Sequence, residues 1–111
     1  MIAKDVDFKD VGDLSLERRR TGNAYLEFLR VASMSAGLYV LPAGSVDTQS
    51  PHGQDELYYV VKGRARMRAG TEDQALEPGH IVFVAAQVEH RFYDIEKELT
   101  VLVLFAPAET S

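Results

Sequence analysis

Short runs rich in β-branched and aromatic residues make up most of the chain after residue 24. Turn residues separate them, including Pro51-His-Gly53, Pro78-Gly79 and the charged segment Glu96-Lys-Glu98. Short runs at this spacing are typical of all-β sandwiches and barrels. The pattern predicts strands at Tyr25–Val31, Ser35–Leu41, Leu57–Lys62, Ala65–Ala69, Gln74–Leu76, Ile81–Val84, Arg91–Ile95 and Leu99–Phe105.

The spacing of these runs excludes a parallel α/β sheet, because the intervening segments are too short for crossover helices. One helix is expected, over Asp13–Gly22, with Asp13 or Ser15 as its N-cap and Gly22 ending it. We therefore expect an all-β fold, an antiparallel barrel or sandwich, with one short N-terminal helix.

Two of the predicted strands contain stretches without polar alternation, Tyr58–Val61 and Val101–Leu104. A strand with one face in water alternates, so these stretches are expected to be covered on both faces. The N-terminal strands or a second subunit would supply the cover, and we expect a homodimer.

Composition narrows the class of protein. With 111 residues the chain is expected to form one domain, residues 1–111. It has no cysteine, so disulfides, thiolate metal ligands and cysteine nucleophiles are excluded. A net charge of −5 disfavours nucleic acid and anionic membranes as partners. No apolar run reaches the ~20 residues of a membrane span, and no signal-peptide core is visible, so we expect a cytoplasmic protein.

His52, Glu56 and His90 are the candidate metal ligands. Two imidazoles and one carboxylate suit a divalent metal that keeps positions open for a substrate. On one straight strand His52 and Glu56 would lie ~13 Å apart. Ligands of one ion must lie within about 4 Å of each other, because each metal–ligand bond is ~2.0–2.2 Å. A shared ion therefore requires a turn at Gly53-Gln54-Asp55, between the two residues.

These residues stand in two motifs that resemble those of the cupin superfamily. The first cupin motif contributes a glycine, the second histidine of a His-x-His pair, a glutamate and a closing glycine, matched by Gly44, His52, Glu56 and Gly63. The second contributes a glycine and a histidine, matched by Gly79 and His90, with Asp94 in place of the usual asparagine. The resemblance implies a jelly roll, or double-stranded β-helix, with a divalent metal (Fe, Mn, Ni or Zn) inside the barrel.

One departure from the cupin pattern changes the expected metal site. Ser50 stands where cupins place the first histidine, which leaves the two-histidine, one-carboxylate set associated with non-haem Fe(II) enzymes. Gln49 is a candidate fourth ligand, because phosphomannose isomerases, which are cupins, use glutamine at that position. However, Gln49 is displaced by one residue and alternation turns it away from His52, so a role behind the ligands fits better unless a bulge brings it inward.

Alternation also predicts the surroundings of the site. Tyr58 shares a face with Glu56, and Phe92 and Asp94 share one with His90. Tyr58 and Phe92 are therefore candidates for the substrate pocket, with plain core packing as the alternative. His80, next to Pro78-Gly79, is expected to have a structural or surface role.

A basic stripe also alternates, and its predicted position is the barrel exterior. Arg64, Arg66 and Arg68 are separated by Ala65 and Met67, which suit the barrel interior. The alternative is an inward stripe that binds an anionic substrate.

Three functions remain open at this point. The chain is expected to be a metal-dependent enzyme of dioxygenase, isomerase or lyase type that acts on a small organic molecule. The alternatives are a non-catalytic small-molecule-binding or sensory domain, and a metal-free structural barrel. The fold does not choose among them, because one fold carries many functions.

Overall fold

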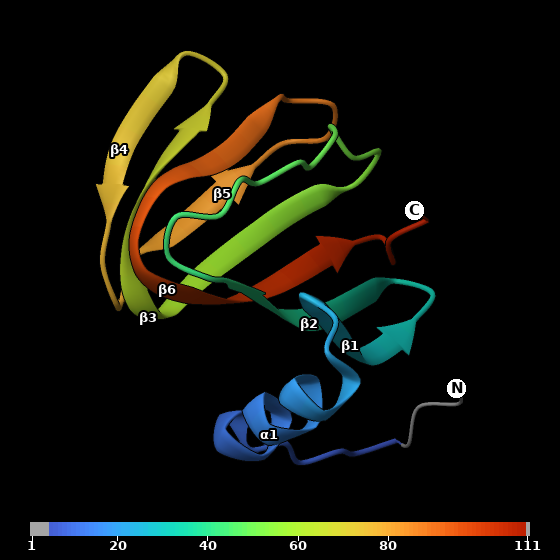
Figure 1. The fold of residues 1–111 in the computed structure, drawn as a ribbon. Helices are drawn as coiled ribbons and strands as arrows, with labels where there is room; N and C mark the ends of the chain where they lie inside the picture. The colour runs from blue at the N-terminus through green and yellow to red at the C-terminus, as the bar shows by residue number, and fades with distance from the viewer. Residues whose placement is uncertain (1–4, 111) are drawn as a thin grey trace.

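The computed structural model describes residues 5–110, and its elements follow the chain as Figure 1 shows. They are α1 (Val11–Thr21), β1 (Tyr25–Val31), β2 (Met34–Leu41), β3 (Asp55–Ala69), β4 (Glu72–Leu76), β5 (Ile81–Val84) and β6 (His90–Ala106).

The strands form one antiparallel sheet that curls into a jelly-roll barrel. Its order is β1-β2-β6-β3-β4, and β5 pairs with the first half of β3. The two long strands, β3 and β6, pair along most of their length, and both bend strongly in Figure 1. The expected all-β, antiparallel fold with one short helix is confirmed.

Two pairs of predicted strands are single long strands. The predicted break at Gly63 is a bend within β3, and the predicted turn at Glu96-Lys-Glu98 lies within β6. Register shifts between Val60 and Arg66 accompany the bend. At Gly63 φ is +107°, and an added Cβ would clash with the backbone oxygen of Glu98. The close approach of the two strands therefore requires glycine here.

Side chains alternate in direction along β3, and Tyr59 is exposed, so the described chain does not supply the expected cover on both faces of Tyr58–Val61. Tyr58, Val60, Ala65 and Met67 are buried in the main hydrophobic core, together with Phe92 of β6. Arg64, Arg66 and Arg68 point outward, which confirms the exterior position of the basic stripe.

The alternation fails at one predicted position in β6. Asp94 is exposed and does not share the inward face of His90 and Phe92. Its φ is +47°, and three residues of β6 bulge where β3 has one between Arg64 and Arg66. Such a bulge reverses the side-chain direction after it, and Ile95 is the next residue to be buried.

Helix α1 packs on the outer face of the sheet through a second, smaller core. Leu14 is buried against Leu38 and Val40 of β2, and Leu102 of β6 packs against the same cluster. The outer face of the apolar stretch in β6 is therefore covered at Leu102 by the N-terminal elements, one of the two covers expected.

The helix begins earlier than predicted but ends as predicted. Its N-cap is Asp10, whose carboxylate accepts a hydrogen bond from the Asp13 amide at 3.0 Å. The predicted caps, Asp13 and Ser15, lie inside the helix. Gly22 ends the helix in the left-handed conformation.

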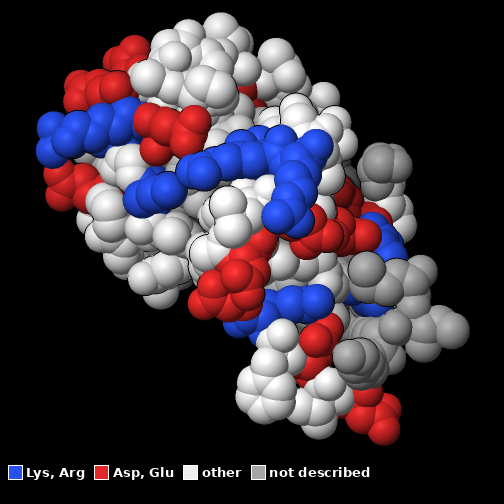
Figure 2. Space-filling view, turned by 60° about the horizontal axis from the view of Figure 1, so that its bottom comes forward, with Lys and Arg blue, Asp and Glu red and all other residues white. Residues whose placement is uncertain are grey.

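Charges of both signs are mixed on the surface. Figure 2 shows Lys and Arg side chains lying beside Asp and Glu side chains on one face. On the barrel exterior, Arg64 pairs with Glu77 and Glu96, and Asp73 pairs with Arg66 and Arg68. No helix within residues 5–110 is long and apolar enough to cross a membrane.

Candidate metal centre

The segment between β2 and β3, residues 42–54, carries His52 and is anchored by a buried aspartate. Asp47 accepts hydrogen bonds from the Tyr39 hydroxyl at 3.0 Å and from the Phe92 amide at 2.9 Å. It also accepts one from the Gln49 side chain at 2.8 Å. The His52 carbonyl in turn accepts from the Gln87 amide at 2.8 Å. A segment without secondary structure is thereby fixed against the barrel.

The turn that a shared metal requires is present between His52 and Glu56. The chain bends at Gly53 and Gln54, and β3 begins at Asp55. His52 itself lies in the preceding loop and does not end a strand. An added Cβ at Gly53 would meet only the Gln87 side chain, at 3.6 Å, so the turn leaves ordinary van der Waals room at this position.

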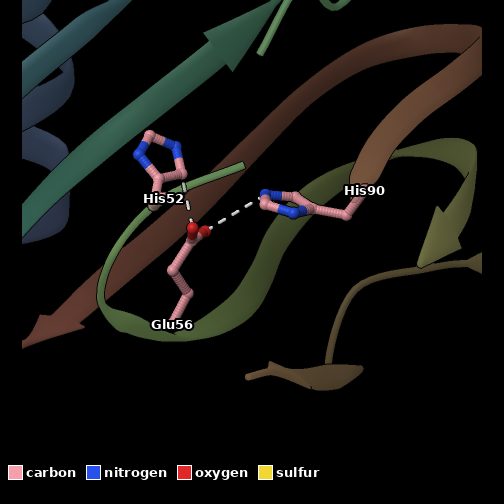
Figure 3. A group of neighbouring side chains, drawn as sticks. All are labelled: His52, Glu56 and His90. Carbon is pink, nitrogen blue, oxygen red and sulfur yellow. Dashed lines mark ion pairs between the residues drawn. The ribbon is translucent and has the colours of Figure 1, made fainter. Parts of the chain in front are cut away.

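His52, Glu56 and His90 converge from three parts of the chain. Figure 3 shows the two imidazole rings on either side of the Glu56 carboxylate. Nε2 of His52 lies 3.6 Å from Oε1 of Glu56, and Nε2 of His90 lies 3.3 Å from Oε2. One ligand atom from each residue lies within 4.8 Å of the other two, close enough to hold one metal ion.

Polar contacts on the far side of each ring favour the tautomer whose Nε2 lone pair faces Glu56. Nδ1 of His90 lies 2.9 Å from the Val88 carbonyl oxygen, which accepts only, so Nδ1 carries the hydrogen. Nδ1 of His52 lies 3.2 Å from a carboxylate oxygen of Glu109, and this negative charge favours a hydrogen on that nitrogen over a lone pair. Both neutral rings therefore direct an Nε2 lone pair toward Glu56.

The Tyr58 hydroxyl completes the cluster. It donates a short hydrogen bond to Glu56 and lies 3.2 Å from Oε1 of Gln49 and 3.0 Å from Nε2 of His90. All three neighbours are acceptors, and the hydroxyl has one proton. Within the described residues, Nε2 of His52 has no hydrogen-bond partner. The cluster therefore has more lone pairs than protons, and a cation would balance it.

Burial and neighbouring charges shift the pKa values of two groups in the cluster, Tyr58 and His90. Burial and the Glu56 carboxylate raise the pKa of the Tyr58 phenol, so it remains a proton donor. Burial alone would lower the pKa of His90, but its hydrogen bonds with Glu56 and the Val88 carbonyl outweigh burial and raise that pKa. The cation that balances Glu56 can thus be a proton on His90 or a metal ion.

Comparison with known proteins identifies the family. Residues 37–106 match the family described as the cupin domain. The chain belongs to the cupins. The match begins within β2, ends with β6 and contains all three candidate ligands.

Individual relatives agree with this assignment. An uncharacterized protein of Streptomyces coelicolor is 48% identical over 98 residues, which cover 88% of this chain and 93% of that protein. The crystal structure of TT1209 from Thermus thermophilus superposes with a TM-score of 0.73 at 26% identity, covering 93% of this chain and 99% of that one. The DMSP lyase DddQ from Ruegeria pomeroyi gives 0.67 at 21% identity, over 78% of this chain and 49% of that one.

At the vacant first-histidine position of this cupin, Ser50 is exposed. Gln49 points to the cluster but its amide is engaged by Asp47 and Tyr58. Phe92 is buried and packs edge-on against the Tyr58 ring, with centroids 5.2 Å apart. His80 lies outside the cluster, where its Nδ1 accepts a hydrogen bond from the Glu77 amide, a structural role.

A pocket of about 190 Å³ adjoins the His52 side of the cluster. Its lining combines aromatic and aliphatic side chains with a few polar groups: Tyr25, Tyr39, Gln49, His52, Val103, Phe105 and Glu109. Burial and the nearby Glu109 carboxylate raise the pKa of Tyr25, whose hydroxyl has no hydrogen-bond partner within residues 5–110. Burial and Asp47 likewise raise the pKa of Tyr39, so both phenols stay protonated.

Sequence reasoning did not find Tyr25, Asp47 or Glu109. Tyr25 and Glu109 lie outside both cupin motifs, and Asp47 occupies an unspecified position inside the first. Each reaches the site through tertiary contacts, so no local spacing marks them. The one available signal was weak: Tyr25 opens a predicted strand, opposite Tyr39 in the neighbouring strand.

Proposed function

We propose that this cupin binds a divalent metal ion through His52, Glu56 and His90. The observation that carries the proposal is the excess of lone pairs around the Tyr58 hydroxyl, with Nε2 of His52 unpaired beside a buried carboxylate. The residues fit such an ion, because two imidazoles and one carboxylate suit Fe, Mn, Ni or Zn. Three protein ligands leave positions open for a substrate.

We propose further that the bound metal serves an enzyme of lyase or isomerase type. When bound, the ion would supply Lewis acidity that polarises a substrate oxygen. Tyr58 supports proton transfer, because its protonated phenol contacts Glu56 and is held by Gln49.

The pocket beside His52 indicates the substrate class. Its volume of about 190 Å³ suits a small molecule rather than a polymer. The lining has aromatic rings and the Glu109 carboxylate, and none of its members is Lys or Arg. A carboxylate beside aromatic rings disfavours a second anionic group. We infer that the part of the substrate in this pocket is neutral or cationic, whereas the cleft on the His90 side, lined by Arg68 and Arg91, suits an anionic group.

A metal-free barrel is the second candidate, and one observation favours it. Tyr58 already donates to Glu56, and the raised pKa of His90 lets a proton balance the carboxylate. The third candidate is a metal-containing cupin that binds a small molecule without converting it. Metal content separates the second candidate from the other two, and turnover of the bound molecule separates the remaining pair.

Elemental analysis of protein purified without chelators tests the metal proposal. We expect about one equivalent of a divalent metal, directly or after reconstitution with Fe(II), Mn(II), Ni(II) or Zn(II). His52→Ala, Glu56→Ala and His90→Ala should each abolish binding. The matched control is His80→Ala, which removes an exposed imidazole outside the cluster and should bind normally. Absence of metal after reconstitution would contradict the proposal and leave the metal-free barrel.

Gln49→Ala tests the fourth-ligand hypothesis separately. Because the Gln49 amide already contacts Asp47 and Tyr58, we expect metal affinity to change only a few-fold. A loss as large as that of His90→Ala would make Gln49 a ligand.

We also propose that this cupin forms a homodimer through the outer face of β3 and β5. Leu57 pairs with Phe83 and Tyr59 pairs with Ile81, and all four side chains point outward, a surface we name the β3–β5 patch. The exposed fractions are 38% for Leu57, 41% for Tyr59, 65% for Ile81 and 63% for Phe83. Contiguous exposed apolar side chains mark interaction surfaces, and a two-fold axis would pair the patch with itself.

The cytoplasmic location and the absence of nucleic-acid and membrane partners stay predictions from the sequence. Cell fractionation and pull-down with nucleic acid or anionic vesicles would test them.

A further inference from the structure

The segment after β6, residues 107–110, folds back across the N-terminal strands and is held there by its backbone. The Glu109 amide donates to the Ser35 hydroxyl at 2.9 Å, and the Glu109 carbonyl accepts from the Arg30 guanidinium at 2.8 Å. The Arg30 guanidinium is itself fixed by two hydrogen bonds to Glu27. The Gln54 side chain, two residues after His52, donates to the Thr110 hydroxyl at 2.9 Å. The position of Glu109 is therefore determined from both sides.

The Glu109 side chain leaves this anchored backbone toward the site. Its Oε2 lies 3.2 Å from Nδ1 of His52, and both side chains are 20% exposed. The Arg30 guanidinium contacts the Glu109 carbonyl oxygen and not its carboxylate, so the negative charge remains available to the imidazole. Because a carboxylate repels a facing lone pair and attracts a hydrogen, its position favours the His52 tautomer with the hydrogen on Nδ1.

We infer that Glu109 is a positioning residue that acts through His52. It holds the ring in the tautomer and orientation that aim the Nε2 lone pair at Glu56, 3.6 Å away. The His52 ring also packs edge-on against Phe105, with centroids 5.2 Å apart, so it is supported from a second direction. A carboxylate on the far nitrogen raises the basicity of a ligating imidazole, and its removal typically weakens metal affinity 10–100-fold.

The inference rests on the proposed metal site for its effect on affinity, but the tautomer of His52 is independent of metal. His52 is the ligand that most needs such support, because it lies in a loop, whereas Glu56 and His90 lie in strands. His90 receives its equivalent support from the Val88 carbonyl, two residues away. His52 receives it from a residue 57 positions later in the chain, which ties the metal site to the segment after β6.

Two variants and one control test the inference. Glu109→Ala removes the acceptor, and Glu109→Gln keeps an acceptor oxygen of nearly the same shape without the charge. The control, Glu72→Ala, removes an exposed carboxylate at the start of β4, outside the site. Co(II) affinity is measured by competition with a chelator, and the visible Co(II) spectrum reports the ligand geometry. The His52 tautomer is read from ring ¹⁵N shifts of the metal-free protein.

We expect Glu109→Ala to weaken Co(II) binding 10–100-fold and to lose the Nδ1–H tautomer of His52. Glu109→Gln should recover most of the tautomer and bind within about tenfold of wild type, since its amide oxygen still accepts. Glu72→Ala should match wild type. If wild type binds Co(II) and Glu109→Ala binds equally well with an unchanged tautomer, Glu109 is no positioning residue. If wild type binds neither Co(II) nor Fe(II), Mn(II), Ni(II) or Zn(II), the metal proposal fails, and the ¹⁵N shifts alone decide whether Glu109 sets the tautomer.

Discussion

The Tyr58 hydroxyl oxygen lies 3.0 Å from Nε2 of His90, the nitrogen whose lone pair a metal would use. The same hydroxyl donates to Glu56, so one phenol contacts two candidate ligands. In the absence of metal it is the hydrogen-bond donor of a buried carboxylate. With a metal bound, that role would pass largely to the ion, and the Tyr58 hydroxyl would retain Gln49 as a hydrogen-bond partner.

Tyr58→Phe should therefore destabilise the metal-free protein more than the metal-loaded one. The variant leaves Glu56, which is 2% exposed, without its hydroxyl donor, and an unpaired buried group costs about 1–3 kcal/mol. Urea unfolding with and without saturating Zn(II) measures the difference. Tyr59→Phe is the matched control, because the neighbouring ring points outward. Equal losses in both states would show that metal does not replace the phenol as the partner of Glu56.

Gly63→Ala should be among the most destabilising single substitutions in β3. Its φ of +107° disfavours any side chain, and a Cβ would clash with the Glu98 oxygen and lie 2.7 Å from the Leu99 Cα. Gly44→Ala isolates the backbone term, since φ is +76° there and nothing lies within 4 Å of the added Cβ. We expect about 1–2 kcal/mol for Gly44→Ala and about 1–3 kcal/mol more for Gly63→Ala. Similar urea midpoints for the two variants would contradict the close-contact argument.

The sequence pattern predicts a strand's bounds well where residues typical of turns lie next to the end of the segment that pairs with another strand. β1 and β5 have the predicted bounds, and residues typical of turns, Gly22-Asn23 and Pro78-Gly79, precede them. The pattern fails at Gly63 and at Glu96–Glu98, where glycine and charge suggest an end but the β3–β6 pairing continues through a bend. Such bends depend on a partner strand that lies about 35 residues away, and no local window contains it.

The candidate site also has one part that the sequence predicts and another part that it does not. His52, Glu56 and His90 are predictable because metal ligands must be of few residue types at a restricted spacing. The requirement for a turn after His52 also follows from strand geometry alone. Asp47 and Glu109, which hold the loop and the ring of His52, have no such restriction. Their roles follow from which surface groups the folded chain brings within hydrogen-bond reach.

Acid should weaken the end of the β3–β4 hairpin through Asp73. Hydrogen bonds from Tyr93, Arg66 and Arg68 hold the pKa of the Asp73 carboxyl below its usual value. A folded-state pKa that is lowered contributes stability above the unfolded-state pKa of about 4, and this contribution is lost as pH falls through the lower folded value. Asp73→Asn should therefore be less stable than wild type at pH 7, with the difference shrinking below about pH 4.

Urea midpoints at pH 7, 5 and 3 measure this change for wild type and Asp73→Asn. Glu72→Gln is the control, because it removes the adjacent charge on β4 without touching the contacts of Asp73. A stability difference that stays constant from pH 7 to pH 3 would show that the Asp73 charge contributes nothing.

The β3–β5 patch should set the oligomeric state. Tyr59 stands in a stretch expected to be covered on both faces, yet it remains 41% exposed, while its neighbours Tyr58 and Val60 are buried. We expect sedimentation analysis of wild type to show a dimer whose dissociation is concentration-dependent.

Phe83→Lys places a charge at the centre of the paired surface and should give monomers, because burying an unpaired ammonium is strongly unfavourable. Val46→Lys, an equally exposed apolar position on the loop before His52, should leave the dimer intact. A dimer that survives Phe83→Lys unchanged must use another surface, and a wild type that is monomeric at all concentrations would mean that the patch has a different occupant. Circular dichroism of both variants separates these outcomes from misfolding, since β5 contacts the core only through Val82 and Val84 and the outward lysine leaves those contacts in place.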